Sequence, residues 1–222
     1  MSAFGDREAQ RDARLEAAPA VALVVAFEVG IAVLSDRRGW ELWVLPWWTW
    51  LGLAAPMLAL AAALPFSTIR DDRAHRRLAL LLLALVIVAN ALALVAVVGS
   101  LLTEAPTGPE LLLKALALWF TNAITFGLWF WELDGGGPLR RAAGRERIEF
   151  QFPQDENREL ATPGWHPRLV DYVYVSLTNS IAFSPTDAMP LSRRMKVLMA
   201  VEAVVSIAAI VLVAARAVNT LG

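Results

Sequence analysis

The sequence contains no cysteine and only two histidines. Without cysteine, the chain cannot form disulfide bonds, thiol nucleophiles, thiolate metal sites or cysteine-ligated iron–sulfur clusters. The histidines, His75 and His166, lie in polar stretches without a metalloprotease, nucleophile-elbow or phosphate-loop motif. The run Gly135–Gly137 lacks a following Lys-Ser or Lys-Thr pair, so it is a hinge rather than a phosphate cradle. We therefore expect a protein that is not an enzyme and needs no cofactor.

Net charge is also small. The chain has 20 Lys and Arg residues against 21 Asp and Glu residues, a formal net charge of -1. This balance gives no global field that would attract nucleic acid, and we expect no nucleic-acid partner. In contrast, 57% of the residues are hydrophobic, whereas an ordinary soluble domain has about 45–50%. A soluble core cannot bury that much apolar surface, so the composition predicts an integral membrane protein whose first partner is the lipid bilayer.

Long apolar runs dominate the chain. A transmembrane helix needs about 20 mostly apolar residues, because each residue rises about 1.5 Å and the hydrocarbon core is about 30 Å thick. The alternating pattern of an outer-membrane strand is absent. We therefore predict an all-α polytopic bundle of about five transmembrane helices, at Ala17–Leu34, Trp43–Phe66, Leu78–Leu102, Leu111–Trp131 and Met195–Val218.

Polar stretches divide the chain into four parts. Residues 1–16 are longer and more acidic than the start of a signal peptide, and we expect them to be a cytoplasmic segment. Residues 17–131 hold four helices, and residues 132–168 form a polar loop. Residues 169–222 combine the last helix with a semi-apolar stretch whose apolar core, Tyr172–Phe183, is too short to span a bilayer. That stretch is expected to be re-entrant or interfacial.

Basic residues set the expected orientation in the cell (inner) membrane. With five spans, the side of the N-terminus carries sixteen basic residues and the other side only Arg37 and Arg38. The excess of Lys and Arg marks the cytoplasmic side. Tryptophans near the start of the second span are typical of an aromatic belt at the membrane interface: Trp40, Trp43, Trp47, Trp48 and Trp50.

Polar residues inside the predicted spans are candidate functional groups, because they are costly in lipid. Glu28, near the middle of the first span, could accept a hydrogen bond from Asn90 in the third or Asn122 in the fourth. It would either tie helices together or handle an ion or proton. In the fourth span, Thr121, Asn122 and Thr125 share a helix face. They would pack helices together or contact a substrate.

Glu202, about two turns into the last span, is the second candidate carboxylate. It could face a water-filled cavity, or approach Lys196 and Ser206 along its own helix. Lys114 lies near the start of the fourth span, where a long side chain can snorkel to the interface.

The segment before the last span resembles a known pore. Tyr174–Asp187 has the sequence YVSLTNSIAFSPTD, and Tyr174, Ser176, Asp187 and Pro190 match the pore-helix and filter pattern of tetrameric potassium channels. The long apolar helix that follows resembles the inner helix of those channels. The whole chain is similar to multi-pass bacterial membrane proteins with such a tail. The resemblance implies a homo-oligomeric, ion-channel-like protein that passes a monovalent cation.

The filter itself departs from the potassium pattern. Ser184, Pro185 and Thr186 stand where the channels have Gly-Tyr-Gly, and such residues resist the backbone conformations that point filter carbonyls inward. We therefore expect no normal potassium filter. The resemblance places the segment on the outer side, whereas the basic residues place it inside. The alternative is a non-conducting scaffold or partner subunit. The residues expected to line a constriction are Thr178, Asn179, Ser180, Ser184, Thr186 and Asp187.

Overall fold

The chain is mostly helical, as predicted. The computed structural model describes residues 3–41, 45–63, 72–103, 108–142, 148–182 and 187–221. The long helices are α1 (Ala3–Arg38), α2 (Thr49–Ala63), α3 (Asp72–Thr103), α4 (Gly108–Leu133) and α8 (Arg193–Leu221). The shorter elements are η3 (Asp134–Gly136), α5 (Pro138–Ala142), β1 (Phe150–Gln151), α6 (Pro153–Glu156), α7 (Leu169–Ala182) and β2 (Met189–Pro190).

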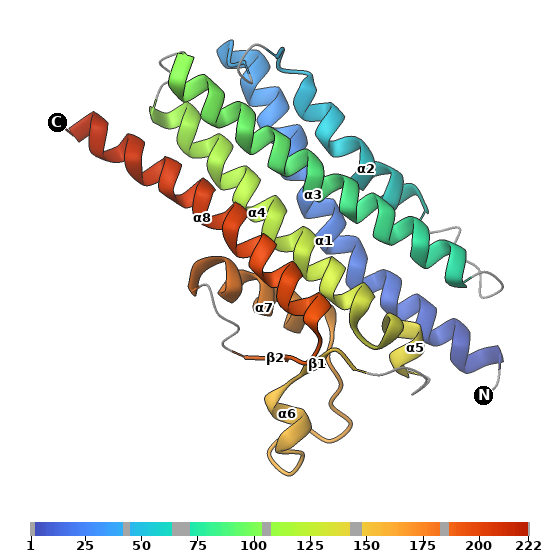
Figure 1. Cartoon of the computed structure of the whole chain (residues 1–222). Coiled ribbons are helices and arrows are strands. Elements are labelled where there is room, and N and C mark those ends of the chain that lie inside the picture. Colours follow the sequence, from blue (N-terminus) through green and yellow to red (C-terminus); the bar gives the residue numbers. More distant parts are fainter. Residues whose placement is uncertain are drawn as a thin grey trace.

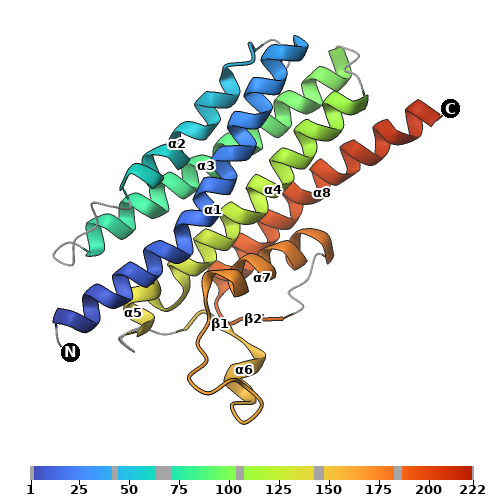
Figure 2. The same cartoon turned by 180° about the vertical axis from the view of Figure 1, so that it is seen from behind.

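The long helices form a bundle around α4, as Figures 1 and 2 show. Helix α4 packs against α1, α3, α7 and α8, and α2 packs against α1 and α3. The short helix α7 lies beside α4 and α8 at one end of the bundle (Figure 1). The start of α1, the elements α5 and α6 and both strands lie at this same end, whereas the chain ends at the opposite one. We call them the N-terminal end and the far end.

Three helical stretches are long and apolar enough to cross a membrane: Leu15–Arg38, Arg76–Ser100 and Gly108–Gly136. Helix α3 shows the physical pattern. Leu81, Leu85, Val88 and Leu92 recur every three or four residues and are 54–64% exposed, whereas the opposite face is buried. A helix that exposes a continuous apolar stripe needs an apolar surround, so these helices are compatible with a membrane-associated protein.

Two boundaries differ from the sequence prediction. Helix α1 has 36 residues and begins at Ala3, so the segment 1–16 continues the first helix from that residue on instead of forming a separate part. Helix α2 has only 15 residues, with Pro56 inside it. Within the predicted span Trp43–Phe66, residues 45–48 are described but not helical, and residues 43–44 and 64–66 lie outside the described residues. Within the expected aromatic belt, Trp47 and Trp48 are exposed, but Trp50 is completely buried among helices.

The described parts of the polar segment 132–168 form a small folded unit that Asp134 holds together. Asp134 is buried, and its Oδ1 atom accepts hydrogen bonds from the backbone N–H groups of Glu149 (2.5 Å) and Phe150 (3.2 Å). Its Oδ2 atom accepts a bond of 2.5 Å from the Tyr172 hydroxyl on α7. Burial raises the pKa of that hydroxyl above its ordinary value of 10.0, so the tyrosine keeps the proton it donates. Strand β1 then pairs with β2 in antiparallel register.

The expected hinge at Gly135–Gly137 is in fact a fixed turn. The three glycines have φ angles of +56°, +79° and +98°. Residues with a Cβ atom rarely adopt such positive φ angles. The guanidinium of Arg141 closes the turn by donating to the carbonyl oxygens of Trp131 and Asp134, both at 2.6 Å. A Cβ atom at Gly135 would lie 2.3 Å from Cγ of Arg141. The glycines are therefore needed for conformation, and not for flexibility.

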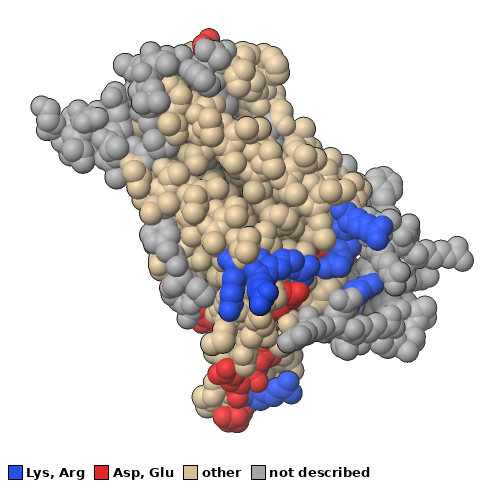
Figure 3. Space-filling model, in the orientation of Figure 1, with Lys and Arg blue, Asp and Glu red and all other residues tan. Residues whose placement is uncertain are grey.

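Basic and acidic side chains lie at different levels along the bundle. Figure 3 shows basic residues in a band between a broad body without described charged residues and the polar unit, with acidic residues beyond them. At the far end, Lys114 does not snorkel outward as predicted. It is buried, 2.6 Å from Glu110 Oε1, and it also donates to the carbonyl oxygen of Glu41. The buried partner and carbonyl neutralise and solvate the ammonium group, which removes the reason to reach for the interface.

Candidate functional site: a buried carboxyl cluster

Glu202 of α8 lies at the centre of the cluster, and its side chain is completely buried. Asn179 of α7 donates from Nδ2 to Glu202 Oε2 over 2.7 Å and to the carbonyl oxygen of Met199 over 2.9 Å. Ser176, one turn earlier on α7, hydrogen-bonds Glu202 Oε1. The two α7 residues therefore occupy both oxygens of the carboxyl. Residues three and four apart share a helix face, so Ser176, Asn179 and Ser180 all point into the bundle.

The hydrogen bonds of the Ser176 hydroxyl indicate whether the Glu202 carboxyl carries a proton. Its oxygen is 2.6 Å from the carbonyl oxygen of Ala123 on α4 and also contacts Glu202 Oε1. A hydroxyl has one hydrogen, and a carbonyl oxygen can only accept. Both bonds can therefore form together only when the Glu202 carboxyl carries a proton and donates it to Ser176. The geometry fits a protonated, neutral Glu202.

The predicted partners of Glu202 are wrong. Lys196 is exposed, and Ser206 instead accepts a hydrogen bond of 3.3 Å from Asn122 Nδ2. Within the described part of the chain, no Lys, Arg or His forms an ion pair with Glu202. A buried carboxylate without a cation is costly, which agrees with the neutral form.

The structure describes four of the six residues expected to line a constriction: Thr178, Asn179, Ser180 and Asp187. Thr178 and Ser180 hydrogen-bond carbonyl oxygens of their own helix, at 3.0 Å and 2.8 Å, and only Asn179 reaches the carboxyl cluster. Ser184 and Thr186 lie outside the described residues, and Asp187 is partly buried just after them. The sequence prediction missed Ser176 as a partner of Glu202. Its signal was available, because Ser176 and Asn179 are three residues apart on one helix face.

Glu28, the other buried carboxyl group, does not meet Asn90 or Asn122 as expected. The group that acts on its carboxyl is Thr121 of α4. However, neither Glu28 Oε2 nor Thr121 Oγ1 makes a hydrogen bond of normal geometry. The contact is therefore loose, and the carboxyl lacks the complete set of partners that Glu202 has.

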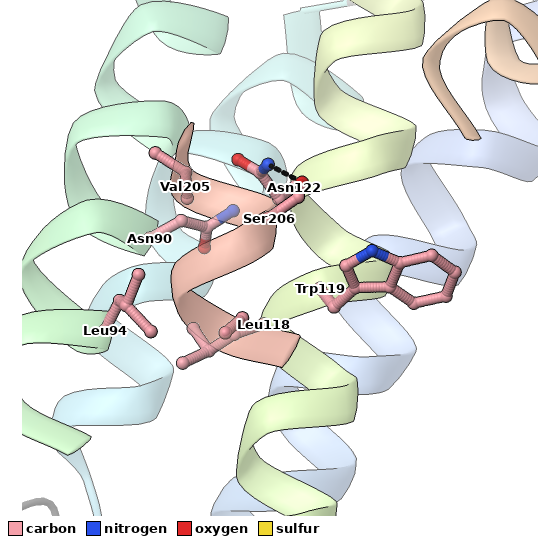
Figure 4. A pocket seen from close by; sticks show the side chains of 8 residues that line it. Asn90, Leu94, Leu118, Trp119, Asn122, Val205 and Ser206 are labelled. Atoms are coloured by element: carbon pink, nitrogen blue, oxygen red, sulfur yellow. Dashed lines mark hydrogen bonds between the residues drawn. The ribbon is translucent and has the colours of Figure 1, made fainter. Parts of the chain in front are cut away.

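Asn90 and Asn122 instead line a small pocket between α3, α4 and α8, seen from close by in Figure 4. Ser206, one turn after Glu202 on α8, lies beside them, and the Asn122–Ser206 bond is drawn there as a dashed line. The remaining lining residues are Leu94, Leu118, Trp119, Val205 and Ala209. The pocket is therefore mainly apolar, with three polar groups at one side.

The chain matches no known family. No family model matches it, and neither the curated proteins nor the solved structures contain a significant match.

Proposed function

We propose that the chain is a multi-pass protein of the cell membrane that passes a monovalent cation, the proton included, with Glu202 as the binding group. The single observation behind this proposal is the cage around Glu202. A carboxyl inside a span is a functional candidate by default, and this one has two polar partners on a helix that is too short to span. Loss of its proton would create a negative site for a cation.

The resemblance to a potassium-channel pore points to the two helices that surround Glu202. The resemblance assigns α7 to the pore helix and α8 to the inner helix, and these two helices supply the whole of the described cage around Glu202. The resemblance also implies a homo-oligomer. Cross-linking of the purified protein in nanodiscs would give its number of subunits. Asp187 would then attract cations near the mouth.

The arrangement of the chain ends supports five spans with the N-terminus in the cytoplasm. Helices α1, α2, α3, α4 and α8 run alternately up and down in Figure 1. Among the exposed basic side chains, six belong to the N-terminal end and two, Arg37 and Arg38, to the far end; the six are Arg77, Arg158, Arg168, Arg193, Arg194 and Lys196. An excess of basic residues on one side is the pattern of a cytoplasmic face.

Flux through proteoliposomes tests the proposal. Purified protein is reconstituted, and passive flux of K⁺, Na⁺ and H⁺ is followed with ion-specific dyes. Glu202→Gln removes the exchangeable charge but keeps the size of the side chain, so we expect flux to fall by about tenfold or more. Glu159→Gln is the matched control, because Glu159 is exposed in the polar unit, and it should conduct like the natural chain.

Two results would overturn the proposal. One is equal flux in the natural protein and in Glu202→Gln. The other is flux no greater than that of empty liposomes from folded, inserted protein. The second result would favour a non-conducting scaffold that uses the polar unit 132–168 as its contact surface.

A further inference from the structure

The pocket between α3, α4 and α8 contains buried polar atoms that make no hydrogen bond within the described structure. These atoms are Oδ1 and Nδ2 of Asn90 and Oδ1 of Asn122, and the two side chains are only 2% and 1% exposed. Figure 4 shows the Asn90 side chain extending toward Asn122 and Ser206. Buried polar groups in proteins almost always have a partner, so three such atoms around one pocket indicate a site for a ligand.

The pocket has room for one very small molecule. The space open to the centre of a water molecule is about 10 Å³, which is close to what a single water needs. A ligand with several heavy atoms would not fit without moving the helices apart. Apart from the three polar residues, the pocket is lined by aliphatic side chains and the ring of Trp119. The ligand therefore meets hydrogen-bonding groups on one side and apolar groups on the others.

The lining also selects a neutral ligand. Among the described residues, no acidic or basic side chain lines the pocket. A metal cation or a halide would be buried there without a counter-ion, which costs far more than burying a neutral group. Water is neutral, has one heavy atom, and both donates and accepts hydrogen bonds.

We propose that this pocket is a binding site for a single water molecule, which links α3 to α4 and α8 inside the bundle. Water has two hydrogens and two lone pairs. It can donate one hydrogen to Asn90 Oδ1 and accept from Asn90 Nδ2, because the two atoms belong to one planar amide and lie side by side. Its second hydrogen can be donated to Asn122 Oδ1. All three unsatisfied atoms then have a partner.

The direct bond at the edge of the pocket leaves a fourth partner for this water. Asn122 Nδ2 donates to Ser206 Oγ over 3.3 Å, which joins α4 to α8. Because the Ser206 oxygen accepts this bond, the hydrogen of its hydroxyl can be donated to the second lone pair of the water. Asn90 brings α3 into the same network. This site belongs to the packing of the bundle, and it stands whether or not Glu202 binds a cation.

Solid-state NMR of the full chain in nanodiscs of deuterated lipid tests for the water. Magnetisation is passed from water protons to the side-chain amides of isotope-labelled asparagines. The matched control is Asn179, which is 3% exposed but donates to the Met199 carbonyl oxygen and to Glu202 Oε2. We expect the Asn90 amide to receive about threefold more signal than the Asn179 amide, or a larger excess. The exposed Asn157 gives the signal for contact with bulk water.

Asn90→Leu gives a second readout, in which a bound water and a dry pocket predict opposite signs. Leucine branches as asparagine does but carries no polar atom. With a bound water, the variant removes two of the four hydrogen bonds of that water, so the melting temperature should fall by about 4 °C or more. With a dry pocket, the variant removes two unsatisfied atoms, so the melting temperature should rise. Val88→Leu is the control and should melt like the natural protein, because Val88 faces outward on α3 and is 55% exposed.

The outcomes decide the site independently of transport. A stronger signal at Asn90 than at Asn179, with a lower melting temperature of Asn90→Leu, would support the bound water. An Asn90 signal no greater than that of Asn179 would overturn it, and so would a melting temperature of Asn90→Leu equal to or above that of the natural protein. If Asn90→Leu does not fold, the comparison of the two amides in the natural chain decides alone. Neither readout involves ion flux, so a failure here leaves the proposed function standing.

Discussion

Replacing Asp134 by asparagine should release the polar unit from the bundle. The carboxylate accepts three hydrogen bonds, from Glu149 N, Phe150 N and the Tyr172 hydroxyl. Hydrogen bonds to charged groups contribute about 1.5–3 kcal/mol each, and asparagine keeps one acceptor oxygen while it turns an NH₂ group toward a donor. We therefore expect Asp134→Asn to lower the local stability by about 2–4 kcal/mol.

Hydrogen exchange at Leu191 measures this loss. The Leu191 N–H donates to the carbonyl oxygen of Glu149 over 2.8 Å, beside the pairing of β1 with β2, and does not touch Asp134 itself. A loss of 2–4 kcal/mol corresponds to exchange that is about 30- to 700-fold faster. Asp171→Asn is the control, because Asp171 accepts only a local bond from Arg168 N. Equal exchange in both variants would show that Asp134 does not hold the unit.

The pH dependence of the same contact has a definite sign. Burial raises the pKa of Tyr172, so the folded protein keeps this hydroxyl protonated where the unfolded chain would lose the proton. Such a group stabilises the fold fully below its ordinary pKa of 10.0, and the stabilisation is lost as pH rises above that value. Tyr172→Phe should remove this alkaline loss. Identical alkaline unfolding of Tyr172→Phe and the natural protein would contradict the assignment.

Two further substitutions test the packing of the bundle, one beside α7 and one at the far end. Gly127→Ala would place Cβ 2.8 Å from Cα of Val173 and push α7 off α4, at a cost of about 1–3 kcal/mol. The control is Gly52→Ala, whose Cβ meets no atom within 4 Å. Thermal unfolding in nanodiscs compares the two variants, and equal melting temperatures would refute the close contact. Lys114→Met leaves Glu110 buried without its cation and should cost about 3–5 kcal/mol, part of which Glu110→Gln restores. Unchanged melting of Lys114→Met would show that the pair contributes little.

Length and hydropathy sufficed to predict the long helices. The predicted spans Leu78–Leu102 and Leu111–Trp131 lie inside α3 and α4, because an apolar run of that length has few alternatives to a helix. The semi-apolar stretch Asp171–Leu191, with its apolar core Tyr172–Phe183, was also predicted as a separate element, and α7 covers most of that core. By contrast, β1 and β2 have two residues each, and their paired residues are 38 and 40 positions apart in the chain, which no local pattern indicates.

The buried polar residues could be located from the sequence, but their partners could not. Spacing along a helix shows which residues share a face, and it does not show which helix that face meets. Glu28 was therefore paired with Asn90 or Asn122, although it lies near Thr121, and Glu202 was paired with its own helix instead of α7. The turn at Asp134 was missed because its three partners are distant in sequence or belong to the backbone.

Glu202 and its partners lie nearer to the N-terminal end of the bundle than to the far end. Glu202 is about two turns from the start of α8, and both its α7 partners lie at the N-terminal end of the bundle. Toward the far end, α1, α3 and α4 pack through an apolar cluster that includes Trp50, Val97 and Leu118, and the buried Lys114–Glu110 pair lies at the same end. If the basic band marks the cytoplasmic face, Glu202 lies nearer to the cytoplasm than to the other side of the membrane. The apolar cluster is then the barrier that must open, or take up water, for a proton to reach the other side.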